Sequence, residues 1–185
     1  MNMRPQKLIL IPTVFSFLML CPTTQAVTPA PDGGYPGYNT AEGQNALFSR
    51  TTGVWNTALG AFTLYSDTSG NGNTAVGINV LRNNLTGRFN TGVGLNALFS
   101  NDGNSGQGEG SLNCAFGVAA LFHNTTGHDN FAFGANALSS NNNSDYDTAV
   151  GSSALLSNTA GYSNTAGRGL HAREQYWQPQ YSCGG

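Results

Sequence analysis

The sequence predicts an all-β protein, a repeat β-solenoid of seven complete turns with about 17 residues each. A block led by asparagine, and once by aspartate, begins again every 17 residues except for a single step of 23. The blocks begin at Asn39, Asn56, Asn73, Asn90, Asn113, Asn130, Asp147 and Asn164. A fixed period of this length is typical of coils in which each turn packs only against its neighbours.

Within the block, glycine and leucine occupy fixed positions in every complete copy. Position 5 is Gly43, Gly60, Gly77, Gly94, Gly117, Gly134 and Gly151. Position 9 is Leu47, Leu64, Leu81, Leu98, Leu121, Leu138 and Leu155. Position 3 is alanine in every block except the one with Gly92, and a second glycine closes most blocks. We expect both glycines of a turn to adopt positive φ at corners of the coil.

The residues between the asparagine and the glycine are short, alternating and β-prone, as in Thr74-Ala75-Val76, which favours a strand of three to five residues. One leucine and one alanine per turn are predicted to fill a thin interior, with the leading asparagines stacked as a hydrogen-bonded ladder. The alternative is one helical turn per block, for which 118–124 (VAALFHN) is suitable. Helices this short are marginal in water, so the β coil is favoured.

The composition excludes some function classes. Charged residues make up only 9% of the chain and the formal net charge is −2 at pH 7, with no basic patch, so nucleic acid is not a predicted partner. The glycine- and asparagine-rich composition resembles that of disordered chains, but the strict register of leucine and alanine argues for a folded repeat. Cys114 and Cys183 lack the regular spacing of a disulfide framework, and Cys114 is predicted as a small buried strand residue.

The chain begins with features of a secretory signal peptide, predicted over residues 1–26. Arg4 and Lys7 precede an apolar run over 8–20, and Ala26 offers a cleavage site. A lipid anchor at Cys21 is the weaker alternative, because the bulky Leu20 before it fits that motif poorly. The expected location is therefore outside the cell, either secreted or on a bacterial cell surface.

The remaining chain divides into three parts. A Pro/Gly-rich lead-in covers 27–38, the solenoid covers 39–166 with an inserted loop near 101–110, and an aberrant tail that is predicted to be disordered covers 167–185. Arg, His, Gln and Trp suddenly become common in the tail. Read one base further along, its codons permit the repeat's own residues, so we hypothesise a frameshift near Gly167 that truncated a longer array. Sequencing of the gene tests this.

Aromatic residues at position 10 form a predicted stripe along one side of the coil. They are Phe48, Tyr65, Phe99 and Phe122. Either the stripe completes the interior of its own chain, or it meets the same stripe on other copies. The second alternative predicts self-association, with a trimer as the expected state.

The blocks Asn73–Gly77 (NTAVG) and Asp147–Gly151 (DTAVG) resemble the Asn-Ser/Thr-x-Ala-x-Gly repeats in the heads of trimeric autotransporter adhesins. The 17-residue repeat is also similar to repeats of bacterial surface proteins and of phage tail-fibre proteins. For residues 39–164, this resemblance implies a left-handed parallel β-roll, three rolls side by side, and a role in attachment.

No catalytic, cofactor-binding or metal-binding residue is predicted, and the chain is not expected to be an enzyme. Glycine motifs such as 70–75 (GNGNTA) arise from the repeat itself. Asp67 begins a stretch like a calcium loop, but Ile78 occupies the position that requires a carboxylate. A weak cation site at Asp102 or Glu109 stays open as an alternative.

The three histidines are read as surface residues of turns. They are His123, His128 and His171.

The sequence as a whole predicts a non-enzymatic exported repeat protein, a cell-surface adhesion or structural module that self-associates and binds a host or surface ligand. One alternative is an ice- or glycan-binding solenoid acting through the threonines of position 2, which Cys114 and Phe131 interrupt. Another is an inert fragment of a longer repeat protein.

Overall fold

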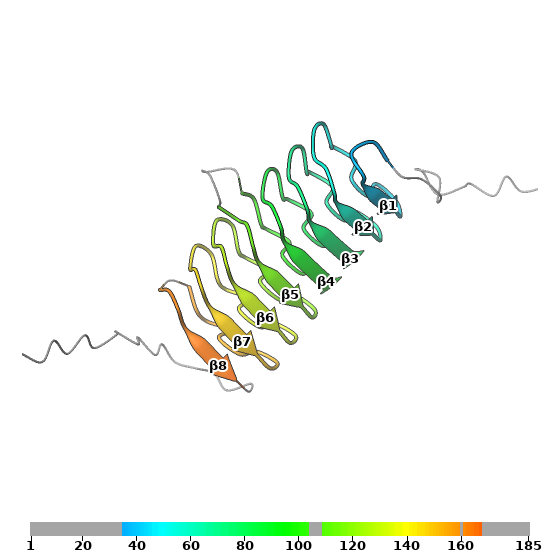
Figure 1. Ribbon diagram of the computed structural model, residues 1–185. Coiled ribbons are helices and arrows are strands. Elements are labelled where there is room, and N and C mark those ends of the chain that lie inside the picture. The colour runs from blue at the N-terminus through cyan, green and yellow to red at the C-terminus, as the bar shows by residue number, and fades with distance from the viewer. Residues whose placement is uncertain (1–34, 104–108, 160, 168–185) are drawn as a thin grey trace, which may run out of the picture.

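The computed structural model describes residues 35–103, 109–159 and 161–167, which form one coil of parallel β-strands. Eight strands lie in chain order in a single sheet, and each turn of the coil stacks on the one before it (Figure 1). The strands are β1 Thr40–Glu42, β2 Thr57–Leu59, β3 Thr74–Ile78, β4 Thr91–Leu95, β5 Cys114–Phe116, β6 Phe131–Phe133, β7 Thr148–Val150 and β8 Thr165–Gly167. The predicted repeat β-solenoid is confirmed.

The strands pair in the register that the repeat predicts. Thr57 of β2 pairs with Thr74 of β3, and Thr91 of β4 pairs with Cys114 of β5 although 23 residues separate them. No residue in the described ranges is helical, so the alternative of a helical turn per block is wrong. Accordingly, the same part of the chain contains no helix that could cross a membrane.

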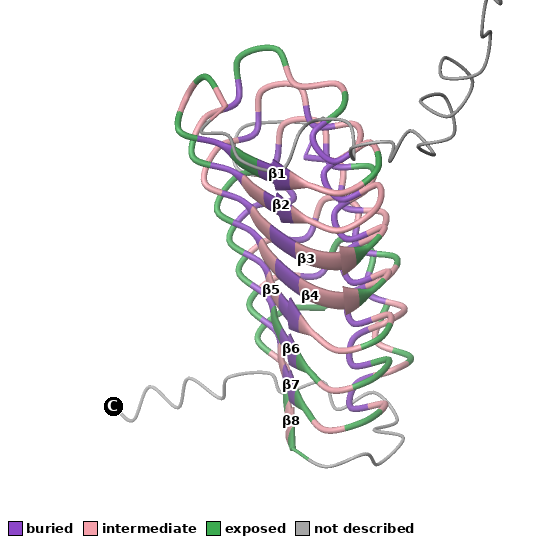
Figure 2. Ribbon diagram, turned by 90° about the vertical axis from the view of Figure 1, so that its right-hand side faces the viewer, coloured by how far each residue is buried: buried purple, intermediate pink, exposed green. Residues whose placement is uncertain are grey.

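Three columns of side chains fill the apolar interior. In Figure 2, buried segments of the chain recur from turn to turn along the coil. Position 9 supplies the leucines that the sequence predicted, and position 3 supplies the alanines. Position 8 adds a third column that was not predicted: Ala46, Thr63, Val80, Ala97, Ala120, Ala137 and Ala154. The third column keeps adjacent walls of the coil close, because five of its seven members are alanine and the other two, Thr63 and Val80, are also small.

The corners of the coil differ from the prediction. Position 5 is glycine with φ between 123° and 141°, as expected. Among the closing glycines, Gly161 also has a positive φ of 117°, but Gly53, Gly70, Gly87 and Gly127 do not. They are glycine because a Cβ would collide with neighbouring oxygens; at Gly87 it would lie 2.3 Å from Asn84 Oδ1. Non-glycine residues at positions 7, 9 and 17 take the left-handed corners instead, and the buried leucines have φ near 50°.

The longer block adds its six extra residues between Gly103 and Gly110. Gly110 occupies the place that Gly87 has one turn earlier, since Asn90 Nδ2 donates to Gly110 O at 2.7 Å as Asn73 Nδ2 donates to Gly87 O at 2.9 Å. Asn101, which the sequence analysis assigned to the loop, is fully buried. The predicted signal peptide and all but one residue of the predicted tail lie outside the described residues.

Candidate functional site: buried ladders and the sheet face

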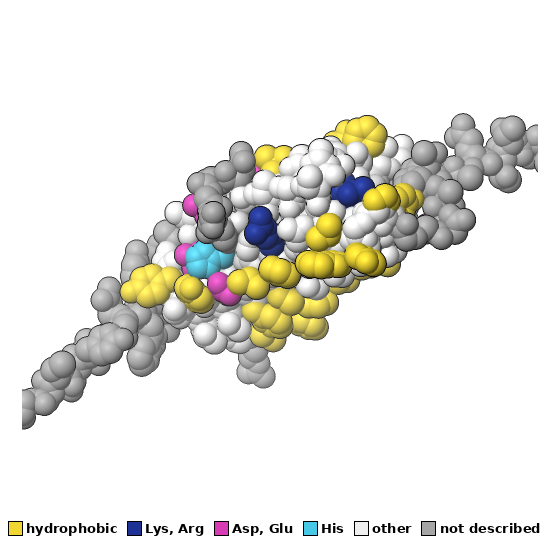
Figure 3. All heavy atoms as spheres, turned by 45° about the horizontal axis from the view of Figure 1, so that its top comes forward, with side chains coloured by type: hydrophobic (Ala, Val, Ile, Leu, Met, Phe, Trp, Pro, Cys, Tyr) yellow, Lys and Arg dark blue, Asp and Glu magenta, His cyan; other side chains and the backbone are white. Residues whose placement is uncertain are grey.

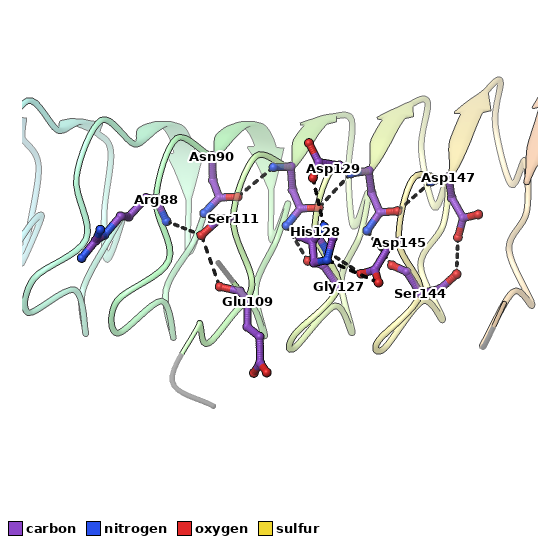
Figure 4. A network of polar contacts seen from close by, with 12 residues as sticks. Arg88, Asn90, Glu109, Ser111, Gly127, His128, Asp129, Ser144, Asp145 and Asp147 are labelled. Atoms are coloured by element: carbon purple, nitrogen blue, oxygen red, sulfur yellow. Dashed lines mark hydrogen bonds and ion pairs between the residues drawn. The ribbon is translucent and has the colours of Figure 1, made fainter. Parts of the chain in front are cut away.

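The leading residues of the blocks form a buried ladder along the coil, as predicted. In each turn the side-chain Oδ1 accepts a hydrogen bond from the backbone N–H of the leading residue of the next turn, at 2.7–3.1 Å. Figure 4 shows the part of this ladder from Asn90 to Asp147. Nearly every buried amide is therefore satisfied, which fixes the register of successive turns.

A second ladder at position 12 was missed by the sequence analysis. It consists of Asp67, Asn84, Asn101, Asn124 and Asn141, all with 0% exposure. Each asparagine Nδ2 donates to the side-chain oxygen of the preceding turn, at 2.8–3.2 Å. Asn113 Nδ2 of the first ladder also donates to Asn101 Oδ1 at 3.3 Å, which joins the two ladders. The interior is thus part apolar and part amide.

The predicted aromatic stripe exists, but Arg82 is part of it. We call Phe48, Tyr65, Arg82, Phe99 and Phe122, all at position 10, the ring column. Phe48 stacks on Tyr65 with ring centroids 5.3 Å apart, and Phe99 stacks on Phe122 at 5.1 Å. The guanidinium of Arg82 lies between the two pairs, 5.7 Å from the Tyr65 centroid and 6.0 Å from that of Phe99. Arg82 is therefore half-buried and belongs to the ring column, although it is charged.

The outer side of the sheet carries a band of exposed apolar residues. Strand residues alternate, so position 3 points inward while positions 4 and 6 point outward. We call the outward residues at positions 4 and 6 the sheet face: Leu59, Val76, Ile78, Val93, Leu95, Phe116, Val118, Phe133 and Val150. Ile78, Leu95 and Phe133 are 50%, 44% and 53% exposed.

The sheet face carries almost no charge. Among the described residues at positions 4 and 6, Glu42 in β1 is the one that is charged. Figure 3 shows exposed apolar side chains gathered in rows that run along the coil. A band of this kind, repeated once per turn and almost free of charge, is a candidate for a functional surface.

Known proteins give no further guide. Comparisons with protein-family models, with curated proteins and with solved structures found no match. The function must therefore be argued from the chemistry of the surfaces and the interior alone.

His128 lies between two carboxylates on adjacent turns. Its Nδ1 is 2.9 Å from Asp129 Oδ2 and its Nε2 is 3.4 Å from Asp145 Oδ2, while its ring meets Tyr146 edge-on (Figure 4). His123, in contrast, is exposed and packs edge-on against a phenylalanine ring. The contacts of His128 tie two turns together, and no nucleophile lies among them.

The other polar residues named in the sequence analysis, Cys114, Asp102 and Glu109, do not form a common site. Within residues 35–103, 109–159 and 161–167, no group of three or more His, Cys, Asp or Glu residues could hold a metal ion. Cys114 lies in β5 as predicted but is half-buried rather than buried, and burial raises the pKa of its thiol. Asp102 and Glu109 each have one buried carboxylate oxygen without a hydrogen-bond partner among the described residues, on either side of the insertion.

Proposed function

We propose that the chain is an exported, non-enzymatic β-solenoid that associates side by side with copies of itself and serves as a cell-surface adhesion or structural module. The observation that carries the proposal is the sheet face, an exposed apolar band that spans β2–β7 and carries no charged residue in those turns. Contiguous exposed apolar bands are typical of interaction surfaces rather than of surfaces that stay in water.

A second copy of the chain is the occupant that fits the sheet face best. The apolar residues recur once per turn along a straight sheet, so a partner must have the same spacing to contact all of them. Another copy of the chain has that spacing because it has the same repeat. Each contact of a valine, leucine or phenylalanine is weak, but contacts in six successive turns add together because the coil holds them rigidly.

The ring column is less suitable as the association surface. Its rings already cover one another's faces, and Arg82 fills the gap between Tyr65 and Phe99. Only the ring edges and the end at Phe48, which is 65% exposed, are left for a partner. We therefore place self-association on the sheet face, and retain a homotrimer as the expected state.

Cells that export the chain provide the test of this function. Intact cells should be labelled by an antibody against the coil, and they should aggregate more than cells without the chain. Leu95→Lys with Phe133→Lys places charges on the sheet face at two exposed positions, and it should abolish the aggregation while the labelling remains. Absence of labelling on intact cells would contradict a surface location, and aggregation by the double variant would contradict the role of the sheet face.

A second candidate function is ice or glycan binding through the threonines of position 2. Thr57, Thr74 and Thr91 lie in register on β2, β3 and β4. Their hydroxyl groups make no hydrogen bond within the described residues, so they are available to a ligand. Thermal hysteresis or binding to a glycan array by the purified monomer would favour this function, and Thr74→Val should then weaken it.

A further inference from the structure

Four of the five residues in the second ladder make the same pair of hydrogen bonds, and Asp67 is the exception. In the turns of Asn84, Asn101, Asn124 and Asn141, the side-chain Nδ2 donates twice: to the ladder residue of the preceding turn, and to the carbonyl at position 15 of its own turn. For Asn101 these bonds are 2.8 Å to Asn84 Oδ1 and 2.7 Å to Gly110 O. Position 12 therefore needs a group that both accepts and donates.

Asp67 occupies this position in the second turn and has no N–H to donate. Its Oδ1 accepts the hydrogen bond from Asn84 Nδ2 at 2.9 Å, as an asparagine oxygen would. Its Oδ2 stands where the other turns have the donating amide, and this oxygen is buried without a hydrogen-bond partner. The whole residue has 0% exposure, so bulk solvent does not reach that oxygen.

The surroundings of Asp67 supply no strong counter-charge. Arg50, at position 12 of the first turn, is the charged residue that faces it, and its guanidinium donates to Gly53 O at 3.3 Å rather than to the carboxylate. The other neighbours, Asn84 and the backbone of Gly70, are neutral. An ionised carboxylate in this place loses its hydration without an ion pair in return, which is costly.

We infer that Asp67 is a proton-binding site of the folded coil, with the proton on Oδ2, and that loss of this proton loosens the turns on either side. A protonated carboxyl group has one acceptor oxygen and one O–H donor, so Oδ1 still accepts from Asn84 while Oδ2 gains one proton to donate on the side where the other turns have an amide. Protonation thus removes a buried charge that has no ion pair, and the coil is more stable in acid than in alkali.

The direction of the pH effect follows from the two states. Burial raises the pKa of Asp67 from its ordinary value of 3.8 to about 7, although the hydrogen bond from Asn84 lowers it in part. Between these two pH values the folded chain binds more protons than the unfolded chain. Stability from this site is therefore complete below about pH 4 and decreases as the pH rises to 7.

The other buried aspartate, Asp147, has hydrogen-bond donors for both of its carboxylate oxygens. Asp147 Oδ1 accepts hydrogen bonds from the backbone N–H and the Nδ2 of Asn164, at 2.7 and 2.9 Å. Asp147 Oδ2 accepts from Asn158 Nδ2 at 2.7 Å and from the hydroxyl of Ser144. Both oxygens have donors, so the missing donor at Asp67 is specific to that turn.

The first test is an NMR titration of the carboxyl carbon of Asp67 in the full-length chain. The resonance should change between its protonated and ionised shifts with a midpoint near pH 7, about three units above that of an exposed aspartate. A midpoint near 4 would overturn the inference, because Asp67 would then be ionised in the coil throughout the neutral range.

The second test compares the melting temperature of the full chain at pH 5 and pH 8. The wild type should melt about 5–10 °C lower at pH 8, whereas Asp67→Asn should lose most of this difference and melt higher than wild type at pH 8. Glu42→Gln, which removes a carboxylate from the outer side of β1, is the matched control and should keep the wild-type difference. Identical pH profiles for wild type and Asp67→Asn would contradict the inference.

Discussion

At the scale of single residues, Val80 and Gly92 are exceptions that explain each other. Position 3 is alanine in all turns except that of Gly92, and position 8 is valine only at Val80. A Cβ on Gly92 would lie 2.4 Å from Val80 Cγ1, so the missing methyl group of Gly92 leaves the space that the larger Val80 fills. The interior therefore keeps its volume although both positions depart from the repeat.

This pairing predicts how the two sites respond to substitution. Gly92→Ala should destabilise the coil by about 1–3 kcal/mol, because the added methyl group overlaps Val80. Adding Val80→Ala should recover most of that loss, since the double variant has the alanines found at both positions in most turns. Chemical denaturation of the two single variants and the double variant measures the coupling, and strictly additive effects would show that the residues do not compete for space.

The neighbours Leu81 and Arg82 test which side chains are inside. Leu81→Ala should cost about 2–5 kcal/mol, because Leu81 is fully buried. Arg82→Ala should cost about 0.5–2 kcal/mol, because it removes the cation from three aromatic rings, the nearest of which, Phe62, is 5.2 Å away. Thermal or urea unfolding provides the measurement, and equal losses at the two sites would contradict the assigned interior.

At the scale of elements, the second ladder is expected to contribute as much to the coil as the leucines. Asn84→Ala removes the donor to Asp67 Oδ1 and to Gly87 O, and leaves Asn101 Nδ2 with one fewer acceptor. The expected cost is about 2–4 kcal/mol, because several buried groups lose their partners. The adjacent Asn83 is exposed, so Asn83→Ala is the control and should change stability by less than about 0.5 kcal/mol. Similar losses of stability from the two substitutions would contradict a stabilising role of the second ladder.

The sequence was sufficient to predict the strands, their parallel register, the leucine column and the leading ladder. Each follows from the 17-residue period combined with the alternation of a β-strand. The second ladder was missed because Arg50 and Asp67 interrupt its asparagines in the first two turns and because position 12 lies outside the strand. The signal was nevertheless present, as five later blocks have asparagine there.

Two features could not be predicted from local preferences. Leucine at φ near 50° contradicts the usual preference of a bulky residue, and stacking on the turns above and below must outweigh that local cost. Arg82 has the position that is aromatic in the adjacent turns, and the rings of Phe62, Tyr65 and Phe99 lie around its guanidinium. The sheet face was visible in the sequence as valine and phenylalanine at position 4, but its exposure became clear only with the fold.

At the scale of the whole molecule, the coil has two kinds of organisation. Inside, amide ladders and a leucine column repeat once per turn and fix the register. Outside, the same period places apolar side chains in straight rows on the sheet. A rigid body with a periodic apolar side favours association with bodies of the same period, which links the repeat to the proposed role.

Sedimentation equilibrium of the purified chain tests this central claim most directly. The wild type should sediment as a homo-oligomer at micromolar concentration, with a trimer as the expected state, and Leu95→Lys with Phe133→Lys should sediment as a folded monomer. Phe48→Lys, at the exposed end of the ring column, is the matched control and should stay oligomeric. A wild-type chain that is a well-folded monomer at these concentrations, or a double variant that still associates, would contradict the account.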